Sequence, residues 1–224
     1  MCGIVGAVSD INIVPILIHG LKQLEYRGYD SCGIAVYGAQ PQLGQGNGLQ
    51  RLRTVNRVNE LETLTQLASA EMQGLSGIAH TRWGTHGTPE IRNAHPHFSN
   101  GPGSNSLQTG SIAVVHNGII ENHAELRKHL RLNGYHFASE TDSEVIAHLV
   151  DFSLRTDLLE AVQQACSQLK GAYALAIMCK HDPHRIVAAR QGSPLVLGIG
   201  KNNKETYLAS DPVALTQVTN AIVY

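Results

Sequence analysis

The segment Met1-Cys2-Gly3-Ile4-Val5-Gly6 places a cysteine where removal of the initiator methionine would make it the N-terminal residue. Such a cysteine joins a thiol, with an ordinary pKa of about 8.5, to an α-amino group with a pKa of about 7.7–8.0. At neutral pH the amine can accept the thiol proton, directly or through one water, so one residue supplies both nucleophile and general base. The apolar residues after Gly3 predict a buried strand that holds this terminus rigid. The alternative interpretation is an ordinary buried cysteine at the start of a strand.

Composition and charge favour one soluble domain in the 224 residues. Seventeen basic and eighteen acidic side chains leave the chain near neutral, without the basic stripe expected of a protein that binds nucleic acid or an anionic membrane. The sequence has no apolar run of the ~18–20 residues that a membrane span needs, and it does not begin like a signal peptide. These features predict a cytoplasmic protein. The four cysteines, Cys2, Cys32, Cys166 and Cys179, form no Cys-x-x-Cys pair and are expected to be free thiols.

Hydrophobic periodicity switches repeatedly between 2 and 3.6 residues along the chain. Helices are expected at 13–25, 60–72, 121–132 and 157–169, and a further helix is expected behind the capping box Thr141-Asp142-Ser143-Glu144, with Asp142 in its first turn. Strands are expected at 3–9, 32–37, 49–55, 76–82, 111–116, 171–179, 185–190, 194–199 and 206–209, with surface loops at 38–48 and 99–110. This order lacks the strict alternation of a doubly wound sheet. It favours an α+β fold of antiparallel sheets covered by helices.

Residues that can carry chemistry gather in five short segments, of which the Cys2 segment is the first. The second, 25–31, holds Arg27 in a polar turn between a helix and a strand. The third, 80–87, combines hydrogen-bond donors with Trp83 and two glycines, a composition suited to a loop that closes over a small anionic group.

The other two segments follow an apolar strand and begin a helix. In 116–122, Asn117-Gly118 can offer a side-chain amide and a backbone N–H to a developing oxyanion, although an Asn-Gly turn is the alternative. In 140–144, Asp142 can bind a cation, or it can merely compensate the helix dipole.

Together these segments resemble the glutaminase domains of the glucosamine-6-phosphate synthases, the isomerising glutamine–fructose-6-phosphate aminotransferases among the class II glutamine amidotransferases. The resemblance runs from Cys2 to about residue 220 and rests on the segments 2–6, 24–31, 80–83, 93–97, 115–122 and 140–146. It implies the four-layer αββα fold of N-terminal-nucleophile (Ntn) hydrolases, with two stacked antiparallel sheets between helical layers. It also implies hydrolysis of L-glutamine to glutamate and ammonia through a Cys2 thioester, with ammonia passed to fructose 6-phosphate to give glucosamine 6-phosphate.

The resemblance also implies which residues perform the reaction. Cys2 would be the nucleophile, its freed α-amino group the base and then the acid, and Arg27 would help to hold that terminus. The Asn117 side chain and the Gly118 N–H would form the oxyanion hole.

Glutamine would be bound by further residues that the same resemblance assigns. Arg82 would pair with the α-carboxylate, supported by Thr85 and His86. Asp142 would accept the α-ammonium group, and Trp83 would belong to the loop that closes on the substrate.

The twelve histidines raise the question of a metal site, because His80, His86, His95, His97 and His116 fall near the proposed site. The sequence contains no His-Glu-x-x-His helix and no Cys/His quartet, and a thiol–amine pair needs no Lewis acid. We therefore expect no metal and no cofactor.

The chain ends at Tyr224, where members of this family continue into a sugar-phosphate isomerase half. We therefore expect a single glutaminase domain over 1–224, which in the full-length, homo-oligomeric enzyme is covalently linked to that half. Two alternatives remain. One is a glutaminase domain of the amidophosphoribosyltransferase type, which shares the Cys2 start. The other is a non-catalytic, glutamine-binding module that retains Met1, so that the basic amine becomes an amide.

Overall fold

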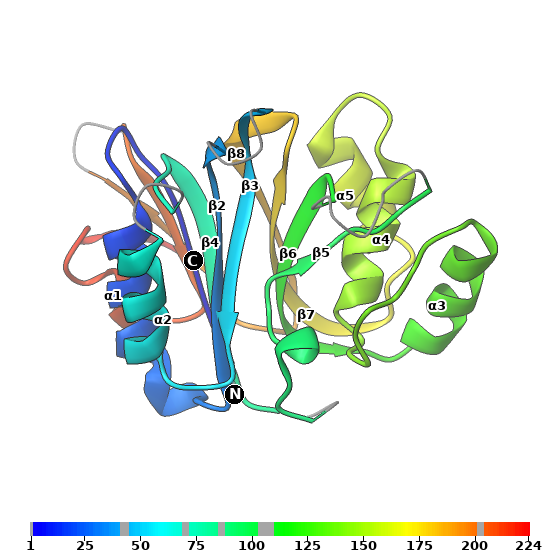
Figure 1. Ribbon diagram of the computed structural model, residues 1–224, viewed down its shortest axis with the longest axis horizontal. Helices are drawn as coiled ribbons and strands as arrows, with labels where there is room; N and C mark the ends of the chain where they lie inside the picture. Colours follow the sequence, from blue (N-terminus) through cyan, green and yellow to red (C-terminus); the bar gives the residue numbers. More distant parts are fainter. Residues whose placement is uncertain (1, 41–44, 69–71, 85–87, 103–109, 201–203) are drawn as a thin grey trace.

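Two antiparallel sheets are stacked face to face between two layers of helices, giving the αββα arrangement expected for an Ntn hydrolase (Figure 1). The computed structural model describes residues 2–40, 45–68, 72–84, 88–102, 110–200 and 204–224. One sheet has the order β11-β9-β10-β1-β4-β2-β3 and the other β5-β6-β7-β8. The strands of the first sheet are β1 (Gly3–Val8), β2 (Ser31–Gln40), β3 (Gln45–Thr54), β4 (Ser76–Arg82), β9 (Val196–Ile199), β10 (Thr206–Ala209) and β11 (Ala221–Val223). Those of the second are β5 (His97–Phe98), β6 (Ile112–Ile120), β7 (Gly171–Cys179) and β8 (Asp182–Gln191).

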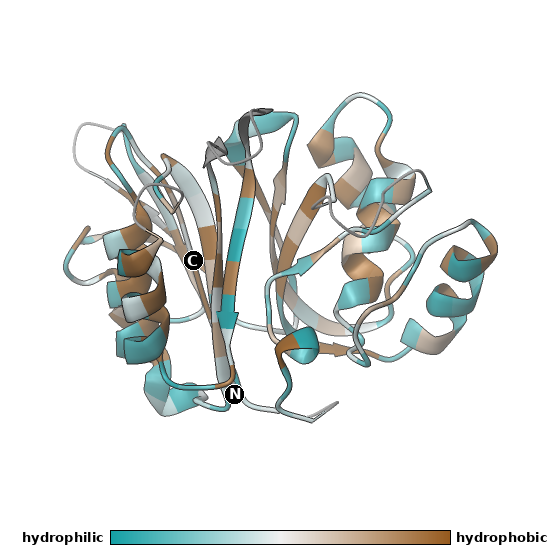
Figure 2. Ribbon diagram, in the orientation of Figure 1, coloured by the Kyte–Doolittle hydropathy of each residue, from teal (hydrophilic) through white to brown (hydrophobic). Residues whose placement is uncertain are grey.

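Helices α1 (Val14–Leu24) and α2 (Val58–Leu67) cover the outer face of the seven-stranded sheet, and α3 (His123–Leu132), α4 (Glu144–Ser153) and α5 (Leu158–Cys166) cover the four-stranded sheet (Figure 1). Each interface between layers has its own apolar core. Ile4, Ile78 and Val115 belong to the core between the sheets, where both faces contribute alternate apolar residues. Figure 2 shows hydrophobic residues along these strands and mixed hydropathy on the outer helices.

Strand β1 lies inside its sheet, between β4 and β10, so Cys2 stands at the end of a strand that is paired on both sides. Gly3 pairs with Thr81, which brings Cys2 beside the end of β4. Hydrogen-bond ladders on both edges of β1 hold the backbone that follows Cys2 in place.

The helix predictions are confirmed with shifts of a few residues at their ends, and all nine predicted strands are present. The prediction of a surface loop over 38–48 is wrong where β2 and β3 extend through it, and 41–44 lie outside the described residues. The short strands β5 and β11 were not predicted. No helix in the described part of the chain is both long and apolar enough to span a membrane.

Around the site, one alternative interpretation and one prediction are wrong. The Asn-Gly turn, which was the alternative for residues 116–122, does not form, because β6 continues through Asn117 and Gly118 in register with β7. The capping box does not form either: α4 begins at Glu144, and its N-cap residue Ser143 makes no capping hydrogen bond through its side chain. Asp142 therefore precedes the helix and lies outside its first turn.

Candidate active site

Five of the predicted site residues line one small pocket: Cys2, Arg82, Trp83, Gly118 and Asp142. The same pocket is lined by four residues that the resemblance did not assign to the site, namely His95, His116, Thr141 and Ser143. The residues come from the end of β1, the end of β4, strand β6 and the turn before α4. The fold thus assembles a thiol, a guanidinium and a carboxylate in one concave place.

The Cys2 thiol is partly buried and contacts the backbone of Trp83. The Trp83 N–H donates to Cys2 Sγ at 3.3 Å. Burial raises the pKa of the Cys2 thiol above its usual value, while the Trp83 N–H and the Arg82 charge act in the opposite direction. With burial dominant, the thiol needs a nearby base to become a thiolate at neutral pH.

Asn117 is held next to Cys2 by hydrogen bonds at both ends of its amide. Its Nδ2 donates to the Cys2 carbonyl oxygen at 3.1 Å, and its Oδ1 lies 3.0 Å from His80 Nε2. An amide nitrogen carries two N–H groups, so the second N–H is available to a group bound at Cys2.

Gly118 combines a backbone conformation and a close approach that other residues cannot adopt. Its φ is +124°, and a Cβ at this position would lie 2.0 Å from the carbonyl oxygen of Ala172 in β7. Glycine at this position therefore allows β6 to pair closely with β7 at the point where Gly118 lines the pocket.

The loop that follows β4 is anchored by Asp30. The Asp30 backbone N–H donates to the Arg82 carbonyl at 3.2 Å, and the Gly84 N–H donates to the Asp30 carboxylate. Trp83 is 48% exposed, and its ring makes an edge contact with Tyr29, with 5.5 Å between centroids. Thr85 and His86, two of the predicted glutamine-binding residues, lie outside the described residues.

Arg27 does not line the pocket, and its guanidinium contacts Tyr26 and Asp211. Its guanidinium forms an ion pair with Asp211, and its Nε donates to the Tyr26 hydroxyl at 2.9 Å. The Tyr26 hydroxyl also donates to Asp211 at 2.9 Å. Asp211 follows Ser210, which is bonded to Ile4 of β1, so Arg27 braces the segment that flanks the nucleophile strand.

Asp142 links the pocket to the end of β6. Its Oδ2 accepts a hydrogen bond from the Ile120 N–H at 2.8 Å. The neighbouring Ser143 hydroxyl lies 2.8 Å from His116 Nδ1. The carboxylate is therefore fixed by the backbone of the strand that carries Asn117 and Gly118.

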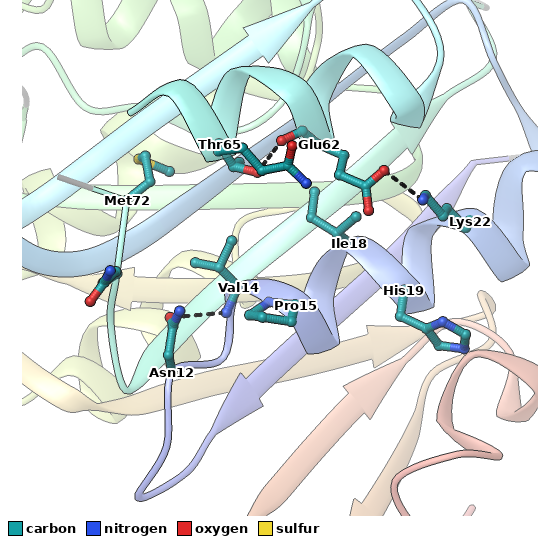
Figure 3. Close-up of a pocket in the computed structure, with 11 residues that line it drawn as sticks. Asn12, Val14, Pro15, Ile18, His19, Lys22, Glu62, Thr65 and Met72 are labelled. Carbon is teal, nitrogen blue, oxygen red and sulfur yellow. Dashed lines mark hydrogen bonds and ion pairs between the residues drawn. The ribbon is translucent and has the colours of Figure 1, made fainter. Parts of the chain in front are cut away.

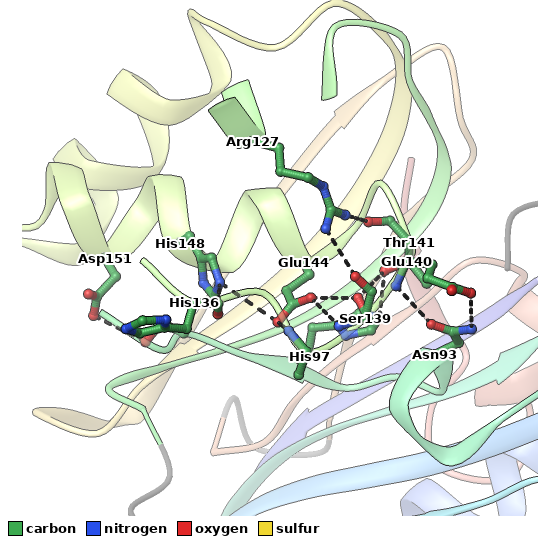
Figure 4. A network of polar contacts seen from close by, with 12 residues as sticks. Asn93, His97, Arg127, His136, Ser139, Glu140, Thr141, Glu144, His148 and Asp151 are labelled. Atoms are coloured by element: carbon green, nitrogen blue, oxygen red, sulfur yellow. Dashed lines mark hydrogen bonds and ion pairs between the residues drawn. The ribbon is translucent and has the colours of Figure 1, made fainter. Parts of the chain in front are cut away.

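A buried polar network holds the turn on which Asp142 stands (Figure 4). The Glu144 carboxylate accepts hydrogen bonds from the backbone N–H groups of Ala138 and Ser139, at 2.9 and 2.7 Å. From α3, Arg127 donates to the carbonyl oxygens of Ser139 and Thr141. With the turn clamped from two helices, the position of Asp142 is set before any ligand arrives.

Four histidines, His80, His95, His97 and His116, form a buried cluster beside the pocket, and two of them, His95 and His116, line it. The rings of His80 and His95 lie 4.0 Å apart, and those of His95 and His97 lie 4.6 Å apart, measured between centroids. Burial lowers the pKa of His80 to about 3 and that of His116 to about 4, and it lowers the pKa of His95 and His97 well below the usual value. These rings are neutral at physiological pH.

Metal coordination is not indicated by the arrangement of these side chains. Within the described ranges, no group of three or more His, Cys, Asp or Glu side chains is placed to hold a metal ion.

A separate cavity of about 400 Å³ lies between α1 and α2 (Figure 3). An ion pair between Lys22 and Glu62, at 2.7 Å, stands at its rim, and Val14, Ile18 and Met72 contribute apolar walls. None of its lining residues lines the Cys2 pocket.

Sequence reasoning missed Asp30, Asp211 and Ser143 as supports of the site. Asp30 lies in the segment 25–31, but no local pattern distinguishes it from a surface turn residue. Asp211 contacts Arg27 across 184 positions of sequence, so only the fold brings them together.

Known proteins show the same fold and sequence pattern. Residues 96–217 match the family described as glutamine amidotransferase domain. The chain is 55% identical over 224 residues to the glutamine–fructose-6-phosphate aminotransferase (isomerizing) of Bordetella pertussis, and 52% identical over 226 residues to that of Pseudomonas putida. Each alignment covers 100% of this chain but 34% of the relative, so the chain spans about a third of the length of these proteins.

Among solved structures, glutamine phosphoribosylpyrophosphate amidotransferase from Bacillus subtilis has a TM-score of 0.77 and 26% identity, covering 96% of this chain and 43% of that one. A glutamine aminotransferase class-II domain protein from Silicibacter pomeroyi has a TM-score of 0.58 and 18% identity, covering 93% and 88%, and shows likeness of fold alone.

Proposed function

Because the chain belongs to the family of glutamine amidotransferase domains, we propose that it hydrolyses L-glutamine to glutamate and ammonia at Cys2. The single observation that carries this proposal is that Cys2, Arg82 and Asp142 line one pocket, which brings a thiol, a guanidinium and a carboxylate to the same site. Free glutamine has one carboxylate, one ammonium and one amide, and the pocket offers a complementary group to each. The reaction needs no cofactor in this proposal.

In the first half of the reaction, the freed α-amino group of Cys2 takes the thiol proton and the sulfur attacks the side-chain amide carbon of glutamine. The carbonyl oxygen becomes an oxyanion that accepts hydrogen bonds from the Asn117 side chain and the Gly118 N–H. Removal of one such donor lowers kcat by on the order of 100- to 1,000-fold. The protonated α-amino group of Cys2 then gives its proton to the amide nitrogen of glutamine. The C–N bond breaks, ammonia leaves, and a thioester remains on Cys2.

In the second half, the α-amino group removes a proton from water, whose oxygen attacks the thioester carbon. A second oxyanion forms in the same place and collapses, the C–S bond breaks, and the thiolate regains its proton as glutamate forms. Arg82, supported by Thr85 and His86, binds the α-carboxylate throughout, Asp142 binds the α-ammonium group, and Trp83 closes over the substrate. Arg27, through Asp211, keeps the N-terminal segment in place.

For the whole protein, we propose the glutaminase half of an isomerising glutamine–fructose-6-phosphate aminotransferase. Identities of 50–55% along the full chain to proteins of that name support it. Residues 1–224 then act as one glutaminase domain whose ammonia is passed to fructose 6-phosphate by a covalently linked sugar isomerase domain, in a cytoplasmic homo-oligomer. The amidophosphoribosyltransferase alternative is supported less well, at 26% identity.

The test combines intact mass with activity. Protein that lacks the initiator methionine should release ammonia from glutamine and take up one equivalent of a diazo-ketone glutamine analogue at Cys2. Cys2→Ala should do neither, with an unchanged melting temperature. Processed wild-type protein that neither reacts nor releases ammonia would contradict the proposal, and protein that retains Met1 but binds glutamine would favour the non-catalytic module.

A further inference from the structure

We propose that His80 is a positioning residue of the glutaminase site: its Nε2–H donates to Asn117 Oδ1 and thereby turns the Asn117 N–H group toward the oxyanion. This inference rests on the proposed function, since it assigns a means of orienting the oxyanion donor. His80 does not line the pocket and would act only through Asn117.

The proton on the His80 ring is fixed by a backbone carbonyl. His80 Nε2 lies 3.0 Å from the His116 carbonyl oxygen and 3.0 Å from Asn117 Oδ1. A carbonyl oxygen can only accept, so Nε2 must carry the hydrogen. His80 Nδ1 has no hydrogen-bond partner among the described residues, as expected for the unprotonated nitrogen of this tautomer.

The orientation of the Asn117 amide is fixed in the same way from its other end. The atom of the amide that faces Cys2 lies 3.1 Å from the Cys2 carbonyl oxygen, which again can only accept. That atom must be Nδ2, and Oδ1 must face His80. Two backbone carbonyls thus determine one chain of donors, from His80 through Asn117 to the nucleophile residue.

The surroundings keep this chain in one state. His80 is fully buried, and burial lowers its pKa to about 3, so the ring is neutral at neutral pH. The His95 ring packs against it at 4.0 Å between centroids. Without the His80 donor, only the Cys2 carbonyl would orient the Asn117 amide, and its N–H groups would be held less firmly toward a developing negative charge.

A double-mutant cycle tests the proposal through kcat and KM for glutamine. His80→Leu should lower kcat by ~10- to 100-fold, the scale of a misplaced catalytic group, with KM for glutamine little changed. His80→Gln, whose amide N–H reaches about as far as Nε2, should recover most of the loss. Because His80 acts through Asn117, the double variant His80→Leu/Asn117→Ala should be no slower than Asn117→Ala alone.

Three outcomes would overturn the role of His80. They are a kcat of the double variant that falls by the product of the two single effects, a change in His80→Leu that is confined to KM, and full activity of His80→Leu. Failure of the proposed function would look different, because wild-type protein would then lack glutaminase activity. If His80→Leu does not fold, ¹⁵N NMR of the wild-type ring decides. A neutral ring protonated at Nε2 between pH 5 and 8 is expected, and protonation at Nδ1 or a charged ring would overturn the proposal.

Discussion

Ile4 and Ser210 hold each other by two reciprocal hydrogen bonds: the Ile4 N–H donates to Ser210 Oγ, and the Ser210 N–H donates to the Ile4 carbonyl, each at 3.0 Å. The two residues are 206 positions apart. They extend the pairing of β1 with β10 by one residue pair beyond Val5 and Ala209, in the direction of Cys2. The rigidity of the Cys2 terminus therefore depends on the C-terminal part of the chain.

Ser210→Ala should destabilise the protein by about 1–3 kcal/mol, because the buried Ile4 N–H loses its acceptor. The measurement is chemical denaturation, with kcat recorded on the same samples. Ser153→Ala is the matched control: Ser153 is also buried, but its hydroxyl has no partner among the described residues, so its removal should cost little. Equal stability losses in the two variants would contradict the interpretation.

Asp142→Asn should raise KM for glutamine by roughly 10- to 100-fold, the value of a hydrogen bond to a charged group. The asparagine oxygen can still accept from the Ile120 N–H, so the fold should persist. Steady-state kinetics with glutamine, together with a thermal melt, separate the two effects. An unchanged KM would remove Asp142 from the ammonium site.

Gly118→Ala should be far more harmful than Gly134→Ala, although both glycines have positive φ, +124° and +84°. At Gly134 the new Cβ would meet a Pro102 side-chain atom at 3.2 Å, and the cost should be near the ~1–2 kcal/mol of the left-handed conformation. At Gly118 it would meet the Ala172 carbonyl oxygen at 2.0 Å, which forces β6 away from β7. Denaturation and activity assays of the two variants should rank them in this order, and similar losses would show that the Ala172 contact is unimportant.

Stability should fall as the pH is lowered from about 6.5 toward 4. Burial lowers the pKa of folded His80 to about 3 and of folded His116 to about 4, whereas unfolded histidine titrates near 6.5. In that window the unfolded chain binds protons that the folded chain does not, so each such histidine should contribute a slope of about 1.4 kcal/mol per pH unit. Denaturation curves at several pH values measure the slope, and a flat profile between pH 6.5 and 4.5 would show that the folded protein binds protons in this range as readily as the unfolded chain.

The sequence allowed the layers to be predicted, and five of the proposed site residues line one pocket, because apolar periodicity and motif spacing are local signals. Helix α1, expected at 13–25, is observed at Val14–Leu24. The turn considered as the alternative at Asn117-Gly118 is absent because long-range pairing with β7 overrides the local turn preference. The capping box failed for a similar reason, since Glu144 satisfies the N–H groups of Ala138 and Ser139 instead.

The pocket draws its residues from both sheets: Cys2 and Arg82 belong to the seven-stranded layer, and Gly118, next to Asn117, belongs to the four-stranded one. In the proposed reaction, the distance between the Cys2 thiol and its oxyanion donors therefore depends on how the two layers are aligned. A misplacement of about 1 Å can cost roughly 100-fold in rate. The rate of the proposed reaction therefore depends on how the two sheets are aligned. A mutation or a partner that shifts one sheet against the other would slow the reaction without contacting the pocket.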